Sequence, residues 1–267
     1  MAETHWNKLG AYLKETQILG SIQNTLYWDQ NTGMPKKGAS WRSEQLTYIA
    51  KVLHERNSSE EFSNLIQSAK NELADIERNS DNQLFIKDKE RNISLLLKEF
   101  NRERNLDPKL VESLAKAKSK GYESWQEAKE KSDFKIFLPF FEELVKLRIE
   151  EAKQISIQCS PWETLAQPFE PELNLKWLNK IFQPLKETIP GLIRAINKSQ
   201  KNHWDLSPES QKNLCSKLLD EFGRDRDLVV VGQSPHPFSI TLGPNDFRIT
   251  TRIVEGEPLS SFLATAH

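Results

Sequence analysis

Cysteine is scarce in this sequence, and neither sign of charge is in excess. The 267 residues include two cysteines, Cys159 and Cys215, which are too few for a disulfide framework or a cysteine-rich metal site. We therefore expect two free thiols and a cytoplasmic protein. The 37 Lys and Arg residues balance the 38 Asp and Glu residues, whereas nucleic-acid-binding proteins usually carry a clear basic excess. We expect no nucleic-acid partner, and we interpret the lysines within 116–120 as a solvated helix face.

Long apolar segments and complete enzyme motifs are also missing. No apolar run approaches the length of a membrane span, and residues 1–8 lack the apolar core of a secretory signal, so we expect no membrane association. Neither a glycine-rich phosphate loop nor a Gly-x-Ser-x-Gly elbow occurs. No two histidines stand four positions apart, so the H-E-x-x-H motif is incomplete; the five histidines are His5, His54, His203, His236 and His267.

Apolar residues recur at helical spacing along most of the chain. One such stripe consists of Phe62, Leu65, Ile66, Ala69 and Leu73. Ser58 and Glu61 are predicted to form a capping box before that stripe. Pro139 is predicted to open a later helix, because proline is favoured in the first helical turn. Pro184 and Pro190 are predicted to kink or divide another helix, because proline removes a backbone hydrogen bond.

The hydrophobic period changes after Gly223. Apolar and polar residues alternate over 238–242 and again over 247–253, and a Gly-Pro-Asn turn joins these runs. This pattern predicts an antiparallel hairpin. Pro258 then opens a final helix. We therefore predict a mainly α fold with a small β-hairpin near the C-terminus, divided into a helical body over 1–223 and a second region over 224–267.

The final predicted helix has no sequence signal for its end. Its apolar positions continue to His267, with no capping glycine, no basic last turn and no following proline. We interpret His267 as a truncation point.

One face of the hairpin carries several polar residues. In a strand, Asp246, Arg248, Thr250 and Arg252 share a side. An arginine held beside an aspartate can bind a carboxylate bidentately. The alternative is a solvated strand face with an ordinary ion pair, as most half-buried strands have. His236, which precedes Pro237 at the strand start, is open to a structural or a catalytic interpretation.

Several separated stretches resemble the carboxypeptidase Taq family of metal-dependent carboxypeptidases. Residues 27–30 and Met34-Pro35, followed by Arg42 and by residues 44–46 and 53–54, resemble that family's first helix pair. His236-Pro237-Phe238 matches its His-Pro-Phe motif, and Asp246-x-Arg248-x-Thr250 matches its Asp-x-Arg-x-Thr motif. Residues 263–267 resemble the approach to its H-E-x-x-H helix, with His267 as the first histidine.

The resemblance implies a zincin-like, mostly helical fold with a small sheet beside a groove, often dimeric. It implies removal of C-terminal residues from peptides with broad specificity, using Zn²⁺ or another divalent metal such as Co²⁺. His267 would be a metal ligand. Arg248 would bind substrate near its end, with Asp246 orienting it and Thr250 supporting it, and His236 and Phe238 would line the same region.

The resemblance covers only the N-terminal part of such an enzyme. The motif Glu and the second histidine would lie beyond His267, so no catalytic residue is expected within the chain. We expect the chain alone to be inactive and to bind metal weakly or not at all. The competing hypothesis is a non-catalytic helical module that binds peptides or partner proteins.

Overall fold

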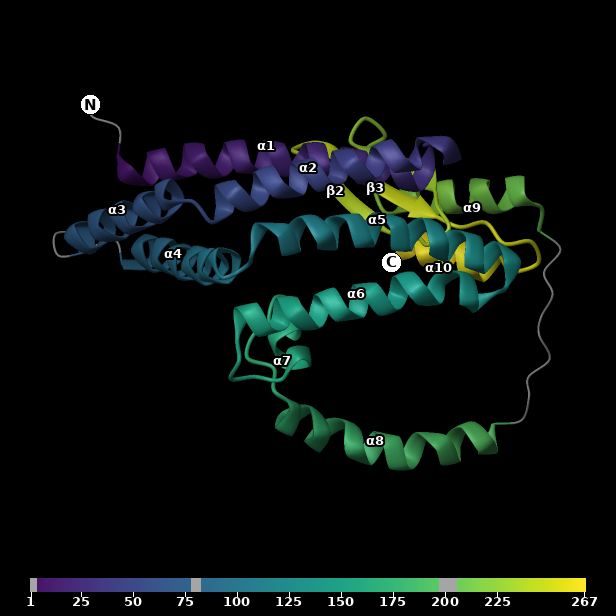
Figure 1. Cartoon of the computed structure of the whole chain (residues 1–267). Coiled ribbons are helices and arrows are strands. Elements are labelled where there is room, and N and C mark those ends of the chain that lie inside the picture. The colour runs from purple at the N-terminus through teal and green to yellow at the C-terminus, as the bar shows by residue number, and fades with distance from the viewer. Residues whose placement is uncertain (1–3, 78–82, 197–205) are drawn as a thin grey trace.

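The computed structural model describes residues 4–77, 83–196 and 206–267, so His203 lies outside the described residues. Within these ranges it has ten α-helices and one three-stranded sheet, which confirms the predicted mainly α fold (Figure 1). The helices are α1 (His5–Thr32), α2 (Ala39–Asn57), α3 (Glu60–Glu77), α4 (Gln83–Arg104), α5 (Pro108–Lys131), α6 (Phe134–Ile155), α7 (Pro161–Ala166), α8 (Leu175–Ala195), α9 (Pro208–Glu221) and α10 (Pro258–Ala266), with a 3₁₀ turn η1 (Lys36–Gly38).

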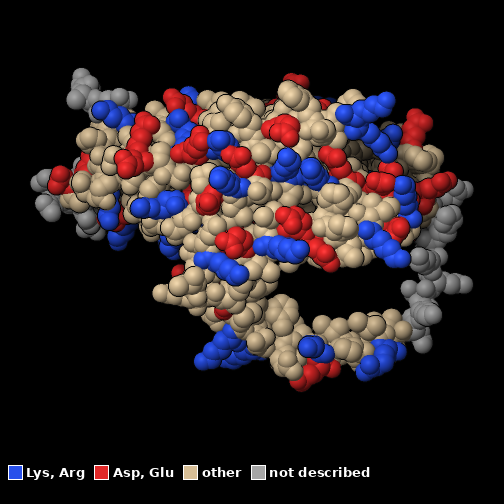
Figure 2. Space-filling model, viewed as in Figure 1, with Lys and Arg blue, Asp and Glu red and all other residues tan. Residues whose placement is uncertain are grey.

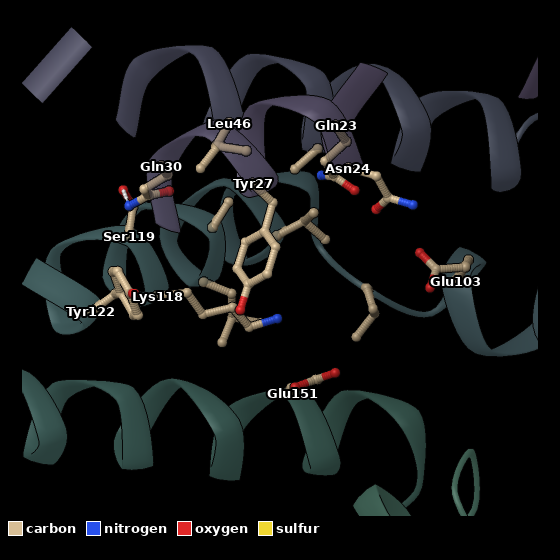
Figure 3. Close-up of a pocket in the computed structure, with 15 residues that line it drawn as sticks. Gln23, Asn24, Tyr27, Gln30, Leu46, Glu103, Lys118, Ser119, Tyr122 and Glu151 are labelled. Carbon is tan, nitrogen blue, oxygen red and sulfur yellow. Dashed lines mark hydrogen bonds between the residues drawn. The ribbon is translucent and has the colours of Figure 1, made fainter. Parts of the chain in front are cut away.

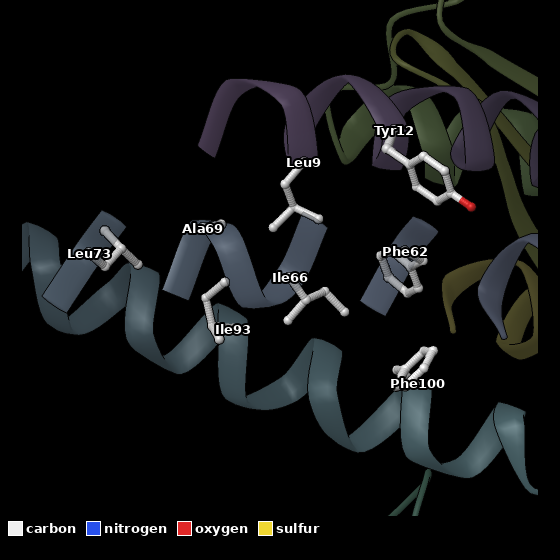
Figure 4. Packing of buried hydrophobic residues seen from close by; sticks show 8 residues of the cluster. All are labelled: Leu9, Tyr12, Phe62, Ile66, Ala69, Leu73, Ile93 and Phe100. Atoms are coloured by element: carbon white, nitrogen blue, oxygen red, sulfur yellow. The ribbon is translucent and has the colours of Figure 1, made fainter. Parts of the chain in front are cut away.

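The main hydrophobic core lies between α1, α3 and α4 (Figure 4). The predicted stripe on α3 supplies much of it, and the full buried cluster is Leu9, Tyr12, Phe62, Ile66, Ala69, Leu73, Ile93 and Phe100. The Phe62 ring stacks on Tyr12 at 5.3 Å between centroids and meets Phe100 edge-on at 6.1 Å. Burying one large apolar side chain contributes roughly 1.5–3 kcal/mol, so this cluster holds the three helices together.

A second layer joins the core to the rest of the chain. Helix α5 packs against α2 on one side and α6 on the other. Leu106, Leu110 and Leu114 are buried there, with Leu144 and Leu147 of α6 packed against them. Figure 1 shows α8 standing apart from this layer, on the far side of α6 from α5.

Two predicted helix starts are wrong. The Phe62 N–H donates to Ser59 Oγ at 3.0 Å, whereas the Ser58 hydroxyl donates back to the His54 carbonyl at 2.7 Å. The tight connection from α2 therefore uses Ser58 to end one helix, and the next serine begins the following helix. Helix α6 begins at Phe134, so Pro139 lies inside it; Asp133 is the cap, because its carboxylate accepts from the Lys135 N–H at 3.0 Å.

Pro184 and Pro190 do not divide α8. The helix is continuous over Leu175–Ala195 with both prolines inside it, and Figure 1 shows that it is curved. Proline removes one backbone hydrogen bond and crowds the preceding turn, which bends a helix without necessarily ending it. Across the described ranges, no helix combines the length and the apolarity needed to cross a bilayer.

The sheet contains the predicted hairpin and one further strand. Strands β2 (Ser239–Gly243) and β3 (Asp246–Thr251) pair antiparallel, which confirms the hairpin. Strand β1 (Val229–Gln233) pairs parallel with β3. The strand order is therefore β1-β3-β2, with β3 at the centre. The central position fixes β3 on both edges, so its side chains have a defined direction.

Candidate functional site

Arg248 and Asp246 form a two-point ion pair on β3. Arg248 Nε lies 2.5 Å from Asp246 Oδ1, and Arg248 Nη2 lies 3.0 Å from Oδ2. The guanidinium also lies over the ring of Trp28 in α1, with 5.6 Å from Cζ to the ring centroid. The hydrogen bond from Arg248 lowers the pKa of Asp246, and the same bond raises the pKa of Arg248. The pair is therefore charged and held in one orientation.

This face of β3 is only partly open to solvent. Thr250 is only 2% exposed, and the Arg248 side chain is 26% exposed because Trp28 covers part of it. Phe247, which points to the opposite side, is 42% exposed. The polar side of the strand is therefore half-buried, because Thr250 is covered while the Arg248–Asp246 pair keeps access to solvent.

Thr250 fastens the His-Pro-Phe loop to the central strand. Its hydroxyl accepts from the Phe238 N–H at 2.8 Å and lies 2.7 Å from Ser234 Oγ. Its own N–H donates to the Phe238 carbonyl at 2.8 Å. Ser234 Oγ also lies 2.7 Å from the His236 carbonyl oxygen. These bonds bring two motifs that are separated in sequence into one unit, and the His236 side chain remains exposed on it.

Two aromatic residues of α1 complete this unit. Phe238 meets the rings of Tyr27 and Trp28 edge-on, at 5.4 and 5.7 Å between centroids. Trp28 also lies directly against Gly232 of β1, where an added Cβ would be 2.9 Å from the indole ring. The residues near 27–30 that resemble the family's first helix therefore lie against its two later motifs.

The end of α1 is held by Arg42, whose side chain is only 11% exposed. Arg42 Nη2 lies 2.6 Å from Asp29 Oδ2, and Arg42 Nη1 donates to the Leu26 carbonyl at 2.5 Å. Arg42 Nε donates to Gln45 Oε1 at 2.9 Å. These contacts join α1 to α2 and fix the turn of helix that carries Trp28.

A polar pocket of about 650 Å³ adjoins the motif loop. It is lined by the end of α1, by α5 and by residues on both sides of the motifs, including Ser234 and Arg252. Two of its atoms, Glu123 Oε1 and Arg252 Nε, are buried with no hydrogen-bond partner in the described chain. Burial also raises the pKa of Glu123. The sequence pattern placed Arg252 on this side of the strand but gave no signal for Glu123, which comes from a distant helix.

A second pocket of about 400 Å³ lies between α1, α2, α5 and α6 (Figure 3). Figure 3 shows the Tyr27 side chain extending into it toward Lys118 and Glu151. Desolvation lowers the pKa of Lys118, and burial raises the pKa of Tyr122 to about 12. Lys118 lines this pocket at its open side, and Lys116, Lys118 and Lys120 are all exposed, as expected for a solvated helix face.

His267 follows α10 directly. Its N–H donates to the Leu263 carbonyl at 3.0 Å, so it continues the helical pattern, and its side chain is exposed. A buried network holds α10 in place. Ser261 Oγ donates to Gln211 Oε1 of α9 at 3.0 Å, and Thr251 Oγ1 of β3 donates to the Ser261 carbonyl at 3.1 Å. The helix end that carries His267 is thus tied to the strand that carries Arg248.

A complete metal centre is not formed by the residues described. Among them, no group of three or more His, Cys, Asp and Glu side chains could hold a metal ion. Protein zinc sites use three or four such ligands. His267 can supply one donor only, so the residues present do not fit a closed metal site.

Comparison with known proteins identifies the family. Residues 8–267 match the family model described as carboxypeptidase Taq (M32) metallopeptidase. Thermostable carboxypeptidase 1 of Thermus thermophilus is 28% identical over 280 residues, which cover 99% of this chain and 54% of that protein. Carboxypeptidase 1 of Bacillus subtilis is 28% identical over 249 residues, covering 91% of this chain and 48% of the relative.

Solved structures agree with this match. The BsuCP crystal structure superposes with a TM-score of 0.87 at 26% identity, covering 98% of this chain and 52% of its own. Trypanosoma cruzi metallocarboxypeptidase 1 shares the fold, with a TM-score of 0.76 at 24% identity. Fold and sequence together place the chain in a family of helical metallopeptidases. The chain belongs to the carboxypeptidase Taq (M32) family, and it spans about half the length of the curated relatives that it matches.

Proposed function

We propose that this chain forms the N-terminal half of a metallocarboxypeptidase that removes C-terminal residues from peptides with broad specificity. This half supplies residues that bind the substrate. The observation that carries the proposal is the geometry of Arg248. Asp246 accepts one hydrogen bond from Nε and one from Nη2, while Nη1 has no partner among the described residues. The remaining edge of the guanidinium can donate to a carboxylate, and the planar fork of arginine suits that group.

The neighbouring residues fit supporting roles. Asp246 orients the guanidinium by its two-point contact, and Thr250 holds the loop of His236 and Phe238 against the strand. The His236 side chain is exposed on this loop, where it can contact a peptide, and the Phe238 ring packs against Tyr27 and Trp28 of α1. A free C-terminal carboxylate is the feature that separates a carboxypeptidase substrate from the interior of a peptide.

His267 is proposed as one ligand of a divalent metal, Zn²⁺ or Co²⁺, in an intact enzyme. Such a metal, when bound, polarises the scissile carbonyl and activates water. The other ligands and the general base are proposed to come from outside the chain, since the described residues do not supply them. From the resemblance we propose a homodimer acting on peptides, and from the two free cysteines we propose a cytoplasmic location. The second candidate, a non-catalytic peptide-binding module, is favoured by this same incomplete donor set.

An activity assay separates the two candidates. The chain alone, with Zn²⁺ or Co²⁺ added, is expected to release no C-terminal amino acid from an N-blocked dipeptide above a metal-only control, because a lone histidine cannot assemble the centre. A joined polypeptide, in which the segment of Bacillus subtilis carboxypeptidase 1 that follows the position aligned with His267 continues this chain, is expected to release it.

The control for this assay is the same dipeptide with an amidated C-terminus, which should be cleaved poorly. Turnover by the purified chain alone would show that ligands within it had been overlooked. A folded joined polypeptide that binds peptides but never cleaves them would favour the non-catalytic module.

A further inference from the structure

Two half-buried side chains of opposite charge line the polar pocket beside the motif loop, and we call this cavity of about 650 Å³ the Glu123–Arg252 pocket. Glu123 Oε1 and Arg252 Nε are covered and have no hydrogen-bond partner in the described chain. The outer atoms of both side chains also lack a hydrogen bond or an ion pair to any residue that the structure describes. Charged groups removed from water are normally paired, so this arrangement calls for a ligand.

The charges at the rim of the pocket pair with one another. Lys36 Nζ lies 3.2 Å from Glu130 Oε1, and Lys131 Nζ lies 2.6 Å from Glu127 Oε1. Figure 2 shows positive and negative side chains intermixed over the end of the molecule where α1 and α5 finish. Because the rim charges are already paired, they do not neutralise the two charged groups inside.

Glu123 lacks a close cation within the pocket. Burial is the largest cause that raises the pKa of its carboxyl group, and Lys120, one helical turn earlier, offsets only part of this effect. Arg252 lines the same pocket but forms no ion pair with Glu123. A ligand cation beside the carboxylate would favour its charged form, and the space between the acid and the base is part of the pocket.

The walls of the pocket are fixed by hydrogen bonds between elements. Lys129 Nζ of α5 donates to the Pro235 carbonyl at 3.2 Å, which joins this helix to the loop after β1. Gln30 Nε2 of α1 donates to Ser119 Oγ of α5 at 3.3 Å. Buried polar residues also line the cavity; they are Gln30, Asn31 and Ser234. The site is therefore preformed, which lowers the cost of binding a small polar molecule.

We propose that the Glu123–Arg252 pocket binds a free α-amino acid. Its ammonium group would bond the outer oxygen of Glu123, and its carboxylate would bond the two Nη atoms of Arg252, since these atoms are not covered. An α-amino acid carries both complementary charges on one small molecule, and the planar guanidinium suits a carboxylate. A free amino acid is also the product of the activity proposed above. Only that link rests on the proposed function, because binding is measured on the chain itself.

Calorimetry with leucine tests the proposal. Leucine should bind at least about tenfold more tightly than N-acetyl-leucine, which lacks the ammonium group, and than leucinamide, which lacks the carboxylate. Glu123→Gln and Arg252→Gln should each weaken leucine binding by at least about tenfold. Glu127→Gln is the matched control, because it removes an acid of the same pocket that is already paired with Lys131, and it should change the affinity by less than about twofold. Melting temperatures check that the variants fold, and the two leucine analogues need no variant.

Several results would overturn the proposal. No binding of leucine at about 10 mM would do so, as would equal binding of leucine and N-acetyl-leucine. Tighter binding of the dipeptide Leu-Leu would assign the pocket to peptide ends. Weaker binding in Arg248→Ala but not in Arg252→Gln would place the amino acid at Arg248, which lies roughly 13 Å away along an extended chain at about 3.3 Å per residue.

The joined polypeptide described above separates this proposal from the proposed function. Leucine binding by the chain that is absent from a folded joined polypeptide would show that other residues fill the pocket, and would overturn the proposal. A joined polypeptide that cleaves no peptide but binds leucine through Glu123 and Arg252 would refute the proposed function and support the amino-acid site.

Discussion

Arg248 contacts both a carboxylate and an aromatic ring, and these contacts limit what it can do. Asp246 fixes its orientation from one edge, and Trp28 covers one face of the guanidinium. An exposed ion pair would contribute only about 0–1 kcal/mol to stability. A structural role alone therefore gives little reason for so ordered a group.

Substitution of Arg248 separates binding from structure. In the joined polypeptide, Arg248→Ala should lower kcat/KM by roughly tenfold to a hundredfold, since a charge-assisted hydrogen bond contributes about 1.5–3 kcal/mol. Arg248→Lys should recover part of this loss, because an ammonium cannot form the bidentate fork. Steady-state kinetics on free-acid and amidated peptides provide the measurement. An equal loss on both substrates would indicate a structural residue.

Asp246 should make stability depend on acid pH. Its folded pKa lies below the ordinary value of 3.8, so its contribution is fully present above that value and is lost as the pH falls through the folded pKa. Thermal unfolding measured from about pH 6 down to about pH 2 should therefore show a smaller acid loss for Asp246→Asn than for the unsubstituted chain. Parallel curves for the two proteins would contradict a native-state pairing with Arg248.

At the scale of single elements, helix starts were predictable where one side chain bonds its own backbone. Asp107 accepts from the Lys109 N–H and Ser207 from the Ser210 N–H, as the Asp-Pro and Ser-Pro pairs indicate. The prediction failed at Ser58, because two adjacent serines compete and the turn from α2 decides between them. Local chemistry therefore predicts that a helix begins, while the packing of its neighbours selects the residue.

The hairpin and the third strand show the same limit. The alternation and the Gly-Pro-Asn turn are local, so the pairing of β2 with β3 was predictable. The parallel pairing of β1 with β3 joins residues 229–233 to 247–251, and nothing within either segment indicates it. The pocket group Glu123 was missed for this reason too, since it approaches Arg252 only in the folded chain.

Gly232 should tolerate no side chain. A Cβ there would lie 2.9 Å from Trp28 Cζ2 and 3.0 Å from Cη2, and the rigid indole has no free end to move. We expect Gly232→Ala to destabilise the chain by about 1–3 kcal/mol, as overpacking usually does. Urea unfolding measures the change. Gly243→Ala is the matched strand control, since no heavy atom lies within 4 Å of its added Cβ, and it should be close to neutral.

For the whole molecule, the sequence predicted the fold class and the family, but not how unevenly the chain is packed. The core of α1, α3 and α4 is closed, whereas α8 has no buried residue. The apolar period of α8 was visible in the sequence, yet a period shows only that a face will be covered. It does not show what covers that face, and the exposure of α8 shows that the described residues do not bury it.

Hydrogen exchange should follow this uneven packing. Amides of the α1–α3–α4 core should exchange slowest, because their opening requires loss of the buried cluster. Amides of α8 should exchange fastest, because its first turn is bonded to Glu163 and none of its residues is buried. Residues 229–267 should lie between these extremes, since the paired strands and the Gln211 network protect them while β1 and β2 are edges within the described sheet. Mass spectrometry of the chain in deuterated buffer provides the measurement. Protection of α8 equal to that of the core, at a concentration where the chain is monomeric, would mean that the body of the chain itself covers this helix in solution.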